Sequence, residues 1–218
     1  PADRSFTVVV PRVLRGRAVP TDAFSATAAG APVPVRAARV EPSRLDLTFA
    51  VVSLGDERAD AVVRAAIVES LTAPADGARV AVVTGSPPAV RAPLRDGADG
   101  ERLASAALAA GELGRDADAA VAAAIATPAP DADRERAVVA FAPAQGLDVL
   151  PAAAVTAGVP IYVVRVGASS GASPSTAAAR NETGGLTFVR GGDAPPIDAL
   201  DAVLEDLAGR YRITIDAP

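Results

Sequence analysis

The 218-residue sequence contains no Cys, His, Met, Trp or Lys, and its formal net charge is −5. These absences exclude disulfide bonds, metal sites built from thiolates or imidazoles, catalysis by a histidine base, and lysines that form Schiff bases or bind phosphate. Half of the residues are hydrophobic and only 3% are aromatic, so the chain can bury a sizeable core of Val, Leu, Ile and closely packed Ala. Because no basic run or aromatic platform is present, we expect no nucleic-acid partner.

Residues 1–44 differ in pattern from the rest of the chain. Phe6–Val10 predicts a short strand, and Gly30 predicts a turn. Val33–Val35 alternates around a proline, which suits only an edge strand. We expect this segment to form a small β-hairpin appendage before a larger domain at residues 45–218, with a partly disordered leader as the alternative.

The larger domain begins with an unbroken apolar run at Leu47–Val52. Such a run is typical of a strand that is buried on both faces. The run breaks at Ser53–Asp56, which includes a glycine, and a helical pattern starts at Glu57. A strand that enters a helix through a short turn is the first half of a βαβ unit, and ligands of open α/β sheets bind where such strands end. We therefore expect any chemistry of this protein near Ser53 to Glu57.

The helical pattern that follows has Asp56 as its predicted N-cap. Its apolar residues recur at helical spacing, whereas its charged residues fall between them. We predict a buried stripe and an exposed charged face, made respectively of Ala59, Val62, Val63, Ala66, Ile67 and Leu71, and of Arg58, Asp60, Arg64 and Glu69.

Strand and helix patterns alternate over the remaining chain. Strands are expected at 79–84, at 89–94 on an edge, and at 136–142, 159–166, 186–189 and 212–215. Helices are expected to begin at Asp99, Asp116, Asp148 and Ser173, and a last apolar stripe over residues 197–211 ends at Tyr211. This alternation predicts a Rossmann-like α/β fold with an open, mostly parallel sheet covered by helices on both faces.

The order and spacing of these elements over residues 45–215 resemble the bacterial branch of the von Willebrand factor A (vWA) family. The best matches are the strand and broken turn at Val51–Asp56, the hydrophobic strand with its flanks at Ala157–Gly167, the helix end at Thr183–Gly185, and the closing pattern at Leu204–Ile215. The resemblance implies a vWA-type sheet, and its bacterial branch carries a hairpin before the first strand.

The family's signature is a metal-ion-dependent adhesion site. Its ligands are an Asp-x-Ser-x-Ser run after the first strand, a Thr from a later loop, and an Asp after the fourth strand. The resemblance places Val52, Leu54 and Asp56 at the first three positions, Asp116 near the Thr, and Ala142–Ala144 at the usual Thr-Asp-Gly. Only Asp56 and Asp116 could supply oxygen atoms, too few for the ligand shell that Ca²⁺ prefers. We predict a degenerate site without metal or cofactor, in which Asp56 is a helix N-cap and Asp116 either caps a helix or is solvated in a loop.

The resemblance implies a non-enzymatic protein–protein interaction or scaffold domain, with partner-binding candidates at Ser53, Asp56, Glu57 and Asp116. One alternative is an adhesion domain that still needs a divalent cation, held by altered ligands. The other is a small-molecule-binding or hydrolytic α/β domain, which a concave pocket with convergent polar groups would favour. Ser53 ends a strand as a nucleophile does, but neither a Gly-x-Ser-x-Gly elbow nor a suitable base accompanies it, so we interpret it as a turn serine.

No segment approaches the ~18 continuous apolar residues of a membrane span, and no signal peptide is recognisable. Because the sequence begins at Pro1 without an initiator Met, we interpret it as a piece of a longer protein. Domains of this family branch often lie outside a membrane anchor. The resemblance therefore favours an extracytoplasmic location in a membrane-anchored or secreted parent protein of bacterial origin.

Overall fold

The computed structural model describes residues 4–9, 19–28, 30–39, 44–71, 78–128, 131, 134–143, 147, 156–166, 183, 185–190 and 196–215. The chain forms two compact units. The larger is an α/β unit, Ser43–Val203, and the smaller combines the two ends of the chain, Pro1–Pro42 and Leu204–Pro218.

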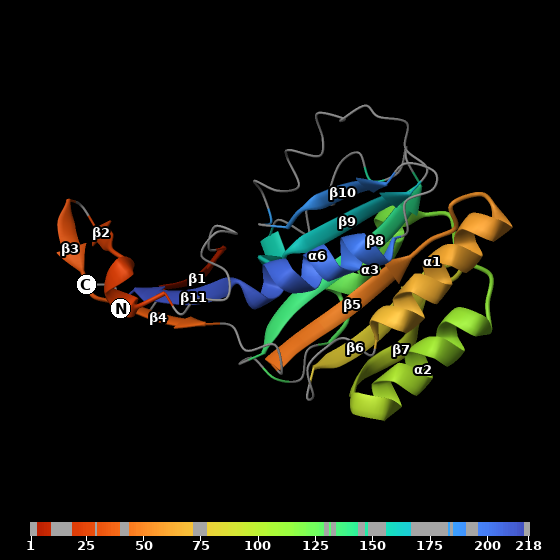
Figure 1. Ribbon diagram of the computed structural model, residues 1–218, viewed down its shortest axis with the longest axis horizontal. Helices are drawn as coiled ribbons and strands as arrows, with labels where there is room; N and C mark the ends of the chain where they lie inside the picture. The colour runs from red at the N-terminus through yellow and green to blue at the C-terminus, as the bar shows by residue number, and fades with distance from the viewer. Residues whose placement is uncertain are drawn as a thin grey trace. The chain divides into compact units, whose positions relative to one another are not determined.

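The α/β unit is built on a six-stranded sheet (Figure 1). Its strands are β5 (Leu45–Val51), β6 (Arg79–Thr84), β7 (Ala89–Asp96), β8 (Glu135–Pro143), β9 (Ile161–Val166) and β10 (Thr187–Arg190). Their order is β10-β9-β8-β5-β6-β7, and all neighbours are parallel except β7, which runs antiparallel at one edge. Every residue of β5 is buried. The prediction that this strand is central, between the strands at 79–84 and 136–142, is therefore confirmed.

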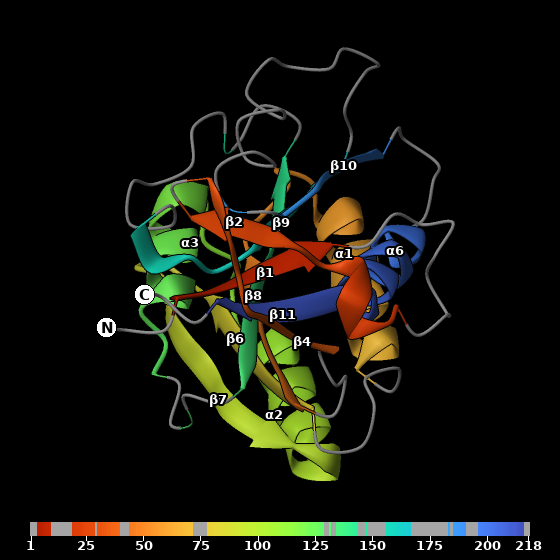
Figure 2. The same ribbon diagram turned by 90° about the vertical axis from the view of Figure 1, so that its left-hand side faces the viewer.

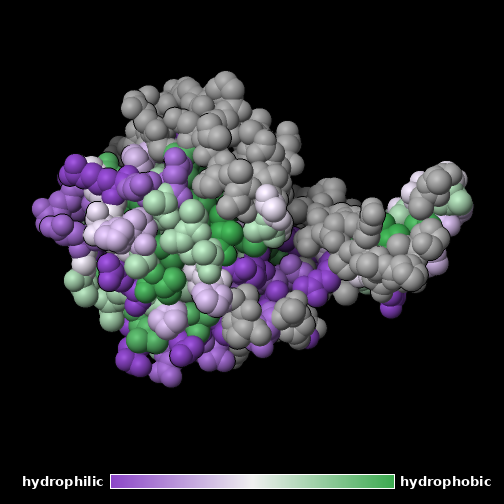
Figure 3. Space-filling model, turned by 180° about the vertical axis from the view of Figure 1, so that it is seen from behind, coloured by the Kyte–Doolittle hydropathy of each residue, from purple (hydrophilic) through white to green (hydrophobic). Residues whose placement is uncertain are grey.

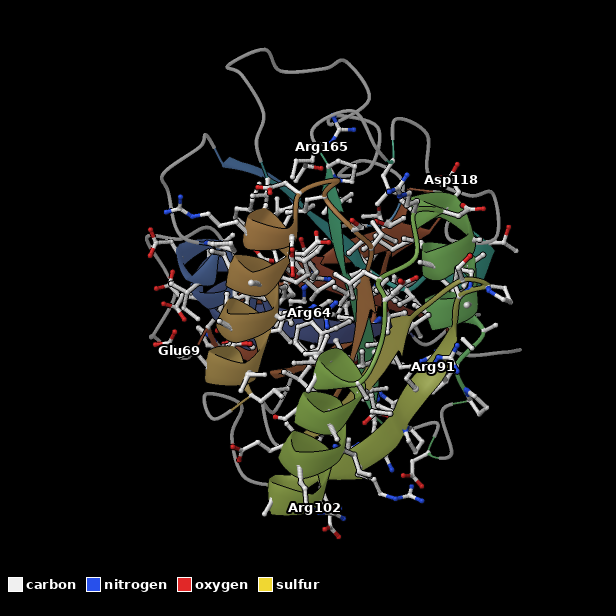
Figure 4. All side chains as sticks on the ribbon, turned by 90° about the vertical axis from the view of Figure 1, so that its right-hand side faces the viewer. Arg64, Glu69, Arg91, Arg102, Asp118 and Arg165 are labelled. Carbon is white, nitrogen blue, oxygen red and sulfur yellow. The ribbon has the colours of Figure 1, made fainter. Side chains whose placement is uncertain are left out.

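Helices cover both faces of this sheet, as predicted. They are α1 (Glu57–Ser70), α2 (Gly97–Ala109), α3 (Ala117–Ile125) and α6 (Ile197–Ala208). Figures 1 and 4 show α1, α2 and α6 on one face and α3 on the other. On the α3 side, Val121 and Ala124 join a core cluster with Ala50 of β5 and Val138 of β8. Seen from behind, hydrophobic and hydrophilic residues are interspersed over the surface (Figure 3).

Helix α1 begins where the sequence predicts but faces its neighbours differently. The Asp56 carboxylate accepts hydrogen bonds from the amides of Arg58 and Ala59, both at 3.3 Å, so it is the N-cap. Val62, predicted to be buried, is 45% exposed. Arg64, predicted to face solvent, is half-buried and donates to carbonyl oxygens of the adjacent helix. The buried face of α1 is therefore rotated from the predicted one, away from Val62 and toward Arg64, because α2 packs beside α1 on the Arg64 side.

Other helix boundaries also differ from the prediction. Helix α2 begins after Asp96, and Asp99 lies in its first turn rather than at its cap. Helix α6 ends at Ala208, so Tyr211 belongs to a strand and not to the helical stripe. The helices predicted to begin at Asp148 and Ser173 lie outside the described residues. Within the part of the chain that the structure describes, no helix is long and apolar enough to cross a membrane.

The smaller unit contains a three-stranded antiparallel sheet of β1 (Arg4–Val9), β11 (Arg210–Ile215) and β4 (Val35–Arg39), in that order (Figure 2). A short hairpin of β2 (Ala26–Ala28) and β3 (Ala31–Val33) turns at a glycine, Gly30, with φ of +83°. We expected a small β-hairpin appendage at residues 1–44. The structure instead places the C-terminal strand at the centre of the N-terminal sheet and assigns residues 204–218 to this unit.

A buried ion-pair network joins the amino ends of β5, β6 and β8. Asp46 is 1% exposed and accepts hydrogen bonds from Arg79 at 2.6 and 2.8 Å and from Arg134 at 2.7 Å. Arg79 also pairs with Asp131 at 2.7 Å. The hydrogen bond to Asp46 is the main cause that raises the pKa of Arg79. These contacts connect the three strands at their amino ends, at the opposite edge of the sheet from their carboxyl ends.

Candidate functional site

A groove of about 780 Å³ lies at the carboxyl end of β5. One wall is the start of α1, and the other is the loop that joins α2 to α3. The lining residues are Ser53, Gly55, Asp56, Glu57, Asp60, Ala61, Arg64, Ala109, Ala110, Gly111, Glu112, Leu113 and Arg115. The groove therefore lies at the carboxyl end of the central strand, which has β6 on one side and β8 on the other. Open α/β sheets bind ligands at this position.

The turn after β5 is closed by a carboxylate from the first turn of α1. Asp60 accepts a hydrogen bond from the Ser53 hydroxyl at 2.8 Å and another from the Leu54 amide at 2.6 Å. The Ser53 oxygen in turn accepts from the amide of Gly55 at 3.1 Å, and Gly55 has φ of +87°, which favours glycine. The Ser53 hydroxyl therefore stabilises the turn between β5 and α1.

Backbone contacts fix the base of the groove. The amide of Ser53 donates to the carbonyl oxygen of Gly114 at 2.7 Å, and Val52 forms a parallel β-bridge with the same glycine. A Cβ atom on Gly114 would stand 2.1 Å from the carbonyl oxygen of Gly85, in the turn after β6. Only glycine fits at position 114 without displacing this turn. The α2–α3 loop is thus held against the ends of two strands by main-chain packing.

Arg64 fixes the other end of the same loop. Its guanidinium donates to the carbonyl oxygens of Leu108 and Gly111, the second at 2.9 Å, and Figure 4 shows it between α1 and α2. Helix α2 has no basic residue in its own last turn. An arginine from α1 therefore satisfies the C-terminal carbonyl groups of α2 and neutralises the negative end of its dipole. This contact sets the position of the wall formed by residues 109–115.

Three exposed charges at the groove remain available to a partner. The side chains of Glu57, Glu112 and Arg115 make no hydrogen bond or ion pair within the described part of the chain. By contrast, Asp60 and Arg64 are engaged by the internal contacts described above. The groove thus offers two carboxylates and one guanidinium above a floor of Leu113 and small residues.

Two carboxylates lie near these strand ends, at the positions where the resemblance leaves oxygen ligands for a divalent cation. Asp56 caps α1, and Asp116 caps α3 by accepting from the Ala119 amide at 2.9 Å. Val52 is buried and apolar, and Pro143 ends β8. Among the described residues, no three acidic side chains come together as a metal-binding group. Both carboxylates that the sequence singled out are therefore engaged in helix capping.

The structure brings together three of the four predicted partner-binding residues. Ser53, Asp56 and Glu57 line the groove, whereas Asp116 is not among the described residues that line it. The sequence did not predict Asp60, Arg64, Glu112 or Arg115 as site residues, and it placed Asp60 and Arg64 on the exposed face of the helix. The position of Asp60 in the sequence could have indicated its role, because an acidic residue in the first turn of a helix can accept hydrogen bonds from the preceding loop. Arg64, Glu112 and Arg115 could not be predicted, because they join the site only through the packing of α2 and its following loop against α1.

No protein-family model and no curated protein matches this sequence. Solved structures do match. The conserved hypothetical protein BatB from Bacteroides thetaiotaomicron is 12% identical with a TM-score of 0.51, over 75% of this chain and 98% of that one. A von Willebrand factor type A protein from Catenulispora acidiphila is 13% identical with a TM-score of 0.53, over 76% and 41%. An aerotolerance-related membrane protein from Bacteroides fragilis is 15% identical with a TM-score of 0.50, over 75% and 96%.

These likenesses, together with the strand order, show the fold class. The α/β unit has a vWA-like fold, which is an open, mostly parallel sheet between two layers of helices. At identities of 12 to 15% the comparisons establish the fold and not the activity.

Proposed function

We propose that the α/β unit is a non-enzymatic protein–protein interaction domain that binds its partner at the groove between α1 and the α2–α3 loop, without a divalent cation. The observation that carries this proposal is the division of the charges around the groove. Asp56, Asp60 and Arg64 are engaged by the fold itself, whereas Glu57, Glu112 and Arg115 are exposed and available. A partner that binds here contacts the side-chain charges of Glu57, Glu112 and Arg115 and the apolar surface around Leu113 rather than a metal ion.

The available groups also explain why we propose binding rather than catalysis. The groove is concave and has convergent polar groups, so a small molecule is the second candidate ligand. The Ser53 hydroxyl, however, already donates to Asp60, and the chain has no His or Lys that could serve as a base for this serine. Binding of a small molecule would therefore occur without turnover.

The setting of the domain is a further part of the proposal. One structural neighbour is described as an aerotolerance-related membrane protein. Together with the family resemblance, this likeness supports an extracytoplasmic domain in a membrane-associated parent protein. Treating intact cells and spheroplasts with protease tests the location. Degradation of the tagged parent protein in spheroplasts without lysis supports an extracytoplasmic domain, and resistance until lysis contradicts it.

Partner capture with matched charge reversals tests the interaction. Immobilised wild-type chain, the Glu57→Arg variant and the Asp118→Arg variant are exposed to extract of the source cells, with EDTA present or absent. Glu57 and Asp118 are both exposed acids in the first turn of a helix, but only Glu57 lines the groove, and Asp118 lies on the opposite face of the sheet (Figure 4). The comparison therefore separates the groove from a general effect of helix charge.

We expect one set of captured proteins to be retained in EDTA, retained by Asp118→Arg and lost with Glu57→Arg. Loss of these proteins on chelation would contradict metal-independent binding and favour a cation-dependent adhesion domain. Equal capture by both charge-reversal variants would place the interaction away from the groove.

A further inference from the structure

The two N-terminal strands of the smaller unit depend on the C-terminal strand for their place in one sheet. Strand β11 pairs with β1 over the whole of its length, from Arg4 opposite Ile215 to Val9 opposite Arg210. On its other side β11 pairs with β4, from Val35 opposite Ile215 to Arg39 opposite Tyr211. In the strand order β1-β11-β4, β1 and β4 meet only through β11.

One face of β11 also supplies the centre of this unit's core. Tyr211 and Ile213 are 5% and 3% exposed, and Ile215 packs beside them. Their partners from residues 1–42 are Val19, Phe24, Val35 and Ala37. In a strand, alternate residues lie on one face, so the pattern Tyr-x-Ile-x-Ile at 211–215 presents all three apolar side chains to these partners.

Tyr211 also makes a polar contact that helps to fix the pairing register of β11. Its hydroxyl oxygen accepts a hydrogen bond from the Val19 amide at 2.9 Å, and its ring centroid lies 5.3 Å from that of Phe24. Next to it, Arg210 pairs with Asp206 at 3.1 Å across Gly209, where α6 ends and β11 begins. A shift of β11 by one residue would break the hydroxyl contact and turn the isoleucines to the opposite face.

We propose that β1 and β4, together with Val19 and Phe24, form an acceptor site for one extended strand of the pattern Tyr-x-Ile-x-Ile, and that the chain's own C-terminal strand is its occupant. Backbone pairing with β1 on one side and β4 on the other provides the affinity for the strand. The apolar partners of residues 211, 213 and 215 provide the selectivity for its sequence, as in other sites that bind an added strand. The smaller unit assembles only when the strand is in place. Removing residues 210–215 therefore takes the smaller unit apart and leaves the α/β unit folded.

Hydrogen exchange measured by mass spectrometry tests this proposal. The compared proteins are the intact chain, a chain that stops after Gly209, and the full-length variant Ile213→Asp, which keeps the chain length but places a charge in the core. Exchange is followed at 4–9 and 35–39 in the smaller unit and at 45–51 in the α/β unit. We expect both variants to exchange at least tenfold faster at 4–9 and 35–39, and unchanged protection at 45–51.

A synthetic peptide of residues 207–218 then tests uptake of the strand in trans. Added to the truncated chain, it is expected to restore protection at 4–9 and 35–39. The same peptide with Ile213→Asp should not restore it, whereas the peptide with Thr214→Asp, one residue along and on the opposite face of the strand, should. Strong protection at 4–9 and 35–39 in the truncated chain without peptide would overturn the proposal, as would equal rescue by the two substituted peptides. An intact chain that is a dimer exchanging β11 between copies would overturn the assignment of its own strand as the occupant.

Discussion

The carboxylate of Asp60 holds the hydroxyl of Ser53 at 2.8 Å and so closes the turn between the central strand and its helix. The same carboxylate accepts from the Leu54 amide at 2.6 Å. We expect Asp60→Ala to lower the free energy of unfolding by about 1–3 kcal/mol, because it leaves half-buried donors without an acceptor. Urea titration followed by circular dichroism measures the loss. Asp118→Ala, which removes an exposed first-turn acid on α3, is the control and should cost about 0.5 kcal/mol or less.

Coupling between the two side chains checks the assignment further. If the hydrogen bond is formed, Ser53→Ala and Asp60→Ala should be non-additive, with a coupling free energy of about 0.5 kcal/mol or more in a double-mutant cycle. Strict additivity would show that Asp60 acts only on the Leu54 amide.

Gly114 is expected to be irreplaceable at the base of the groove. An alanine Cβ at this position would stand 2.1 Å from the carbonyl oxygen of Gly85, so the loop or the turn must move. We predict that Gly114→Ala costs about 1–3 kcal/mol of unfolding free energy. Gly111→Ala is the matched control in the same loop, because its Cβ would meet no atom within 4 Å. Equal denaturation midpoints for the two variants would contradict the close approach.

Three substitutions in α1 test its orientation. Ile67 is fully buried, so Ile67→Ala should cost about 2–5 kcal/mol. Val62 is 45% exposed, so Val62→Ala should change stability by about 0.5 kcal/mol or less. The sequence pattern places Arg64 on the exposed face of α1, where Arg64→Ala would have an equally small cost. Because Arg64 donates to Leu108 and Gly111, we now predict about 1–2 kcal/mol and faster hydrogen exchange over residues 109–115. A neutral Arg64→Ala variant would contradict this capping role.

The ion-pair network at the amino ends of the strands should be far more important than an exposed pair. Asp46→Asn leaves two mostly buried guanidinium groups without their shared carboxylate, and we predict a loss of about 3 kcal/mol. The exposed pair of Asp99 and Arg102 is the control, and Asp99→Asn should cost about 0.5 kcal/mol or less. The free energy of unfolding of both variants is measured by urea and thermal denaturation. Equal losses for Asp46→Asn and Asp99→Asn would contradict the burial of the network.

The pH dependence of this network follows from Arg79. Its pKa is raised in the folded state, mainly by the hydrogen bond to Asp46. The stabilisation linked to Arg79 is therefore fully present below the ordinary pKa of arginine and is lost only as the pH rises through the higher folded value. Consequently, we expect no change in unfolding free energy from Arg79 between pH 6 and 9. Curves of wild type and Asp46→Asn that diverge or converge by more than about 1 kcal/mol across this range would contradict the expectation.

Elements with strong local signals could be predicted from sequence. The unbroken apolar run of β5 predicted a central strand, and Asp56 predicted the start of α1. The orientation of Val62 and Arg64 could not be predicted, because helical spacing alone does not determine where a neighbouring helix packs. The acceptors of Arg64 exist only after α2 has docked. Tyr211 continued the apolar spacing of α6, although Gly209 ends that helix and β11 follows.

The sequence predicted the location of the candidate site but only some of the residues that line it. A strand that enters a helix through a glycine turn located the groove, and Ser53, Asp56 and Glu57 line it. Its second wall comes from residues about sixty positions later in the chain, so Glu112 and Arg115 gave no local signal. The strand acceptor in the smaller unit was missed for a related reason, because its parts lie at opposite ends of the sequence.

Calorimetric titration with Mg²⁺, Ca²⁺ and Mn²⁺ most directly tests the central claim that this vWA-like fold binds without a metal. Wild type is compared with the double variant Asp56→Asn, Asp116→Asn, which removes both carboxylate charges while asparagine keeps the capping ability of each position. We predict no saturable binding by either protein at up to about 1 mM metal, since each cation would depend on water for nearly all of its ligands. Saturable binding to wild type that is absent in the double variant would contradict the account and show a cation site formed by these two residues.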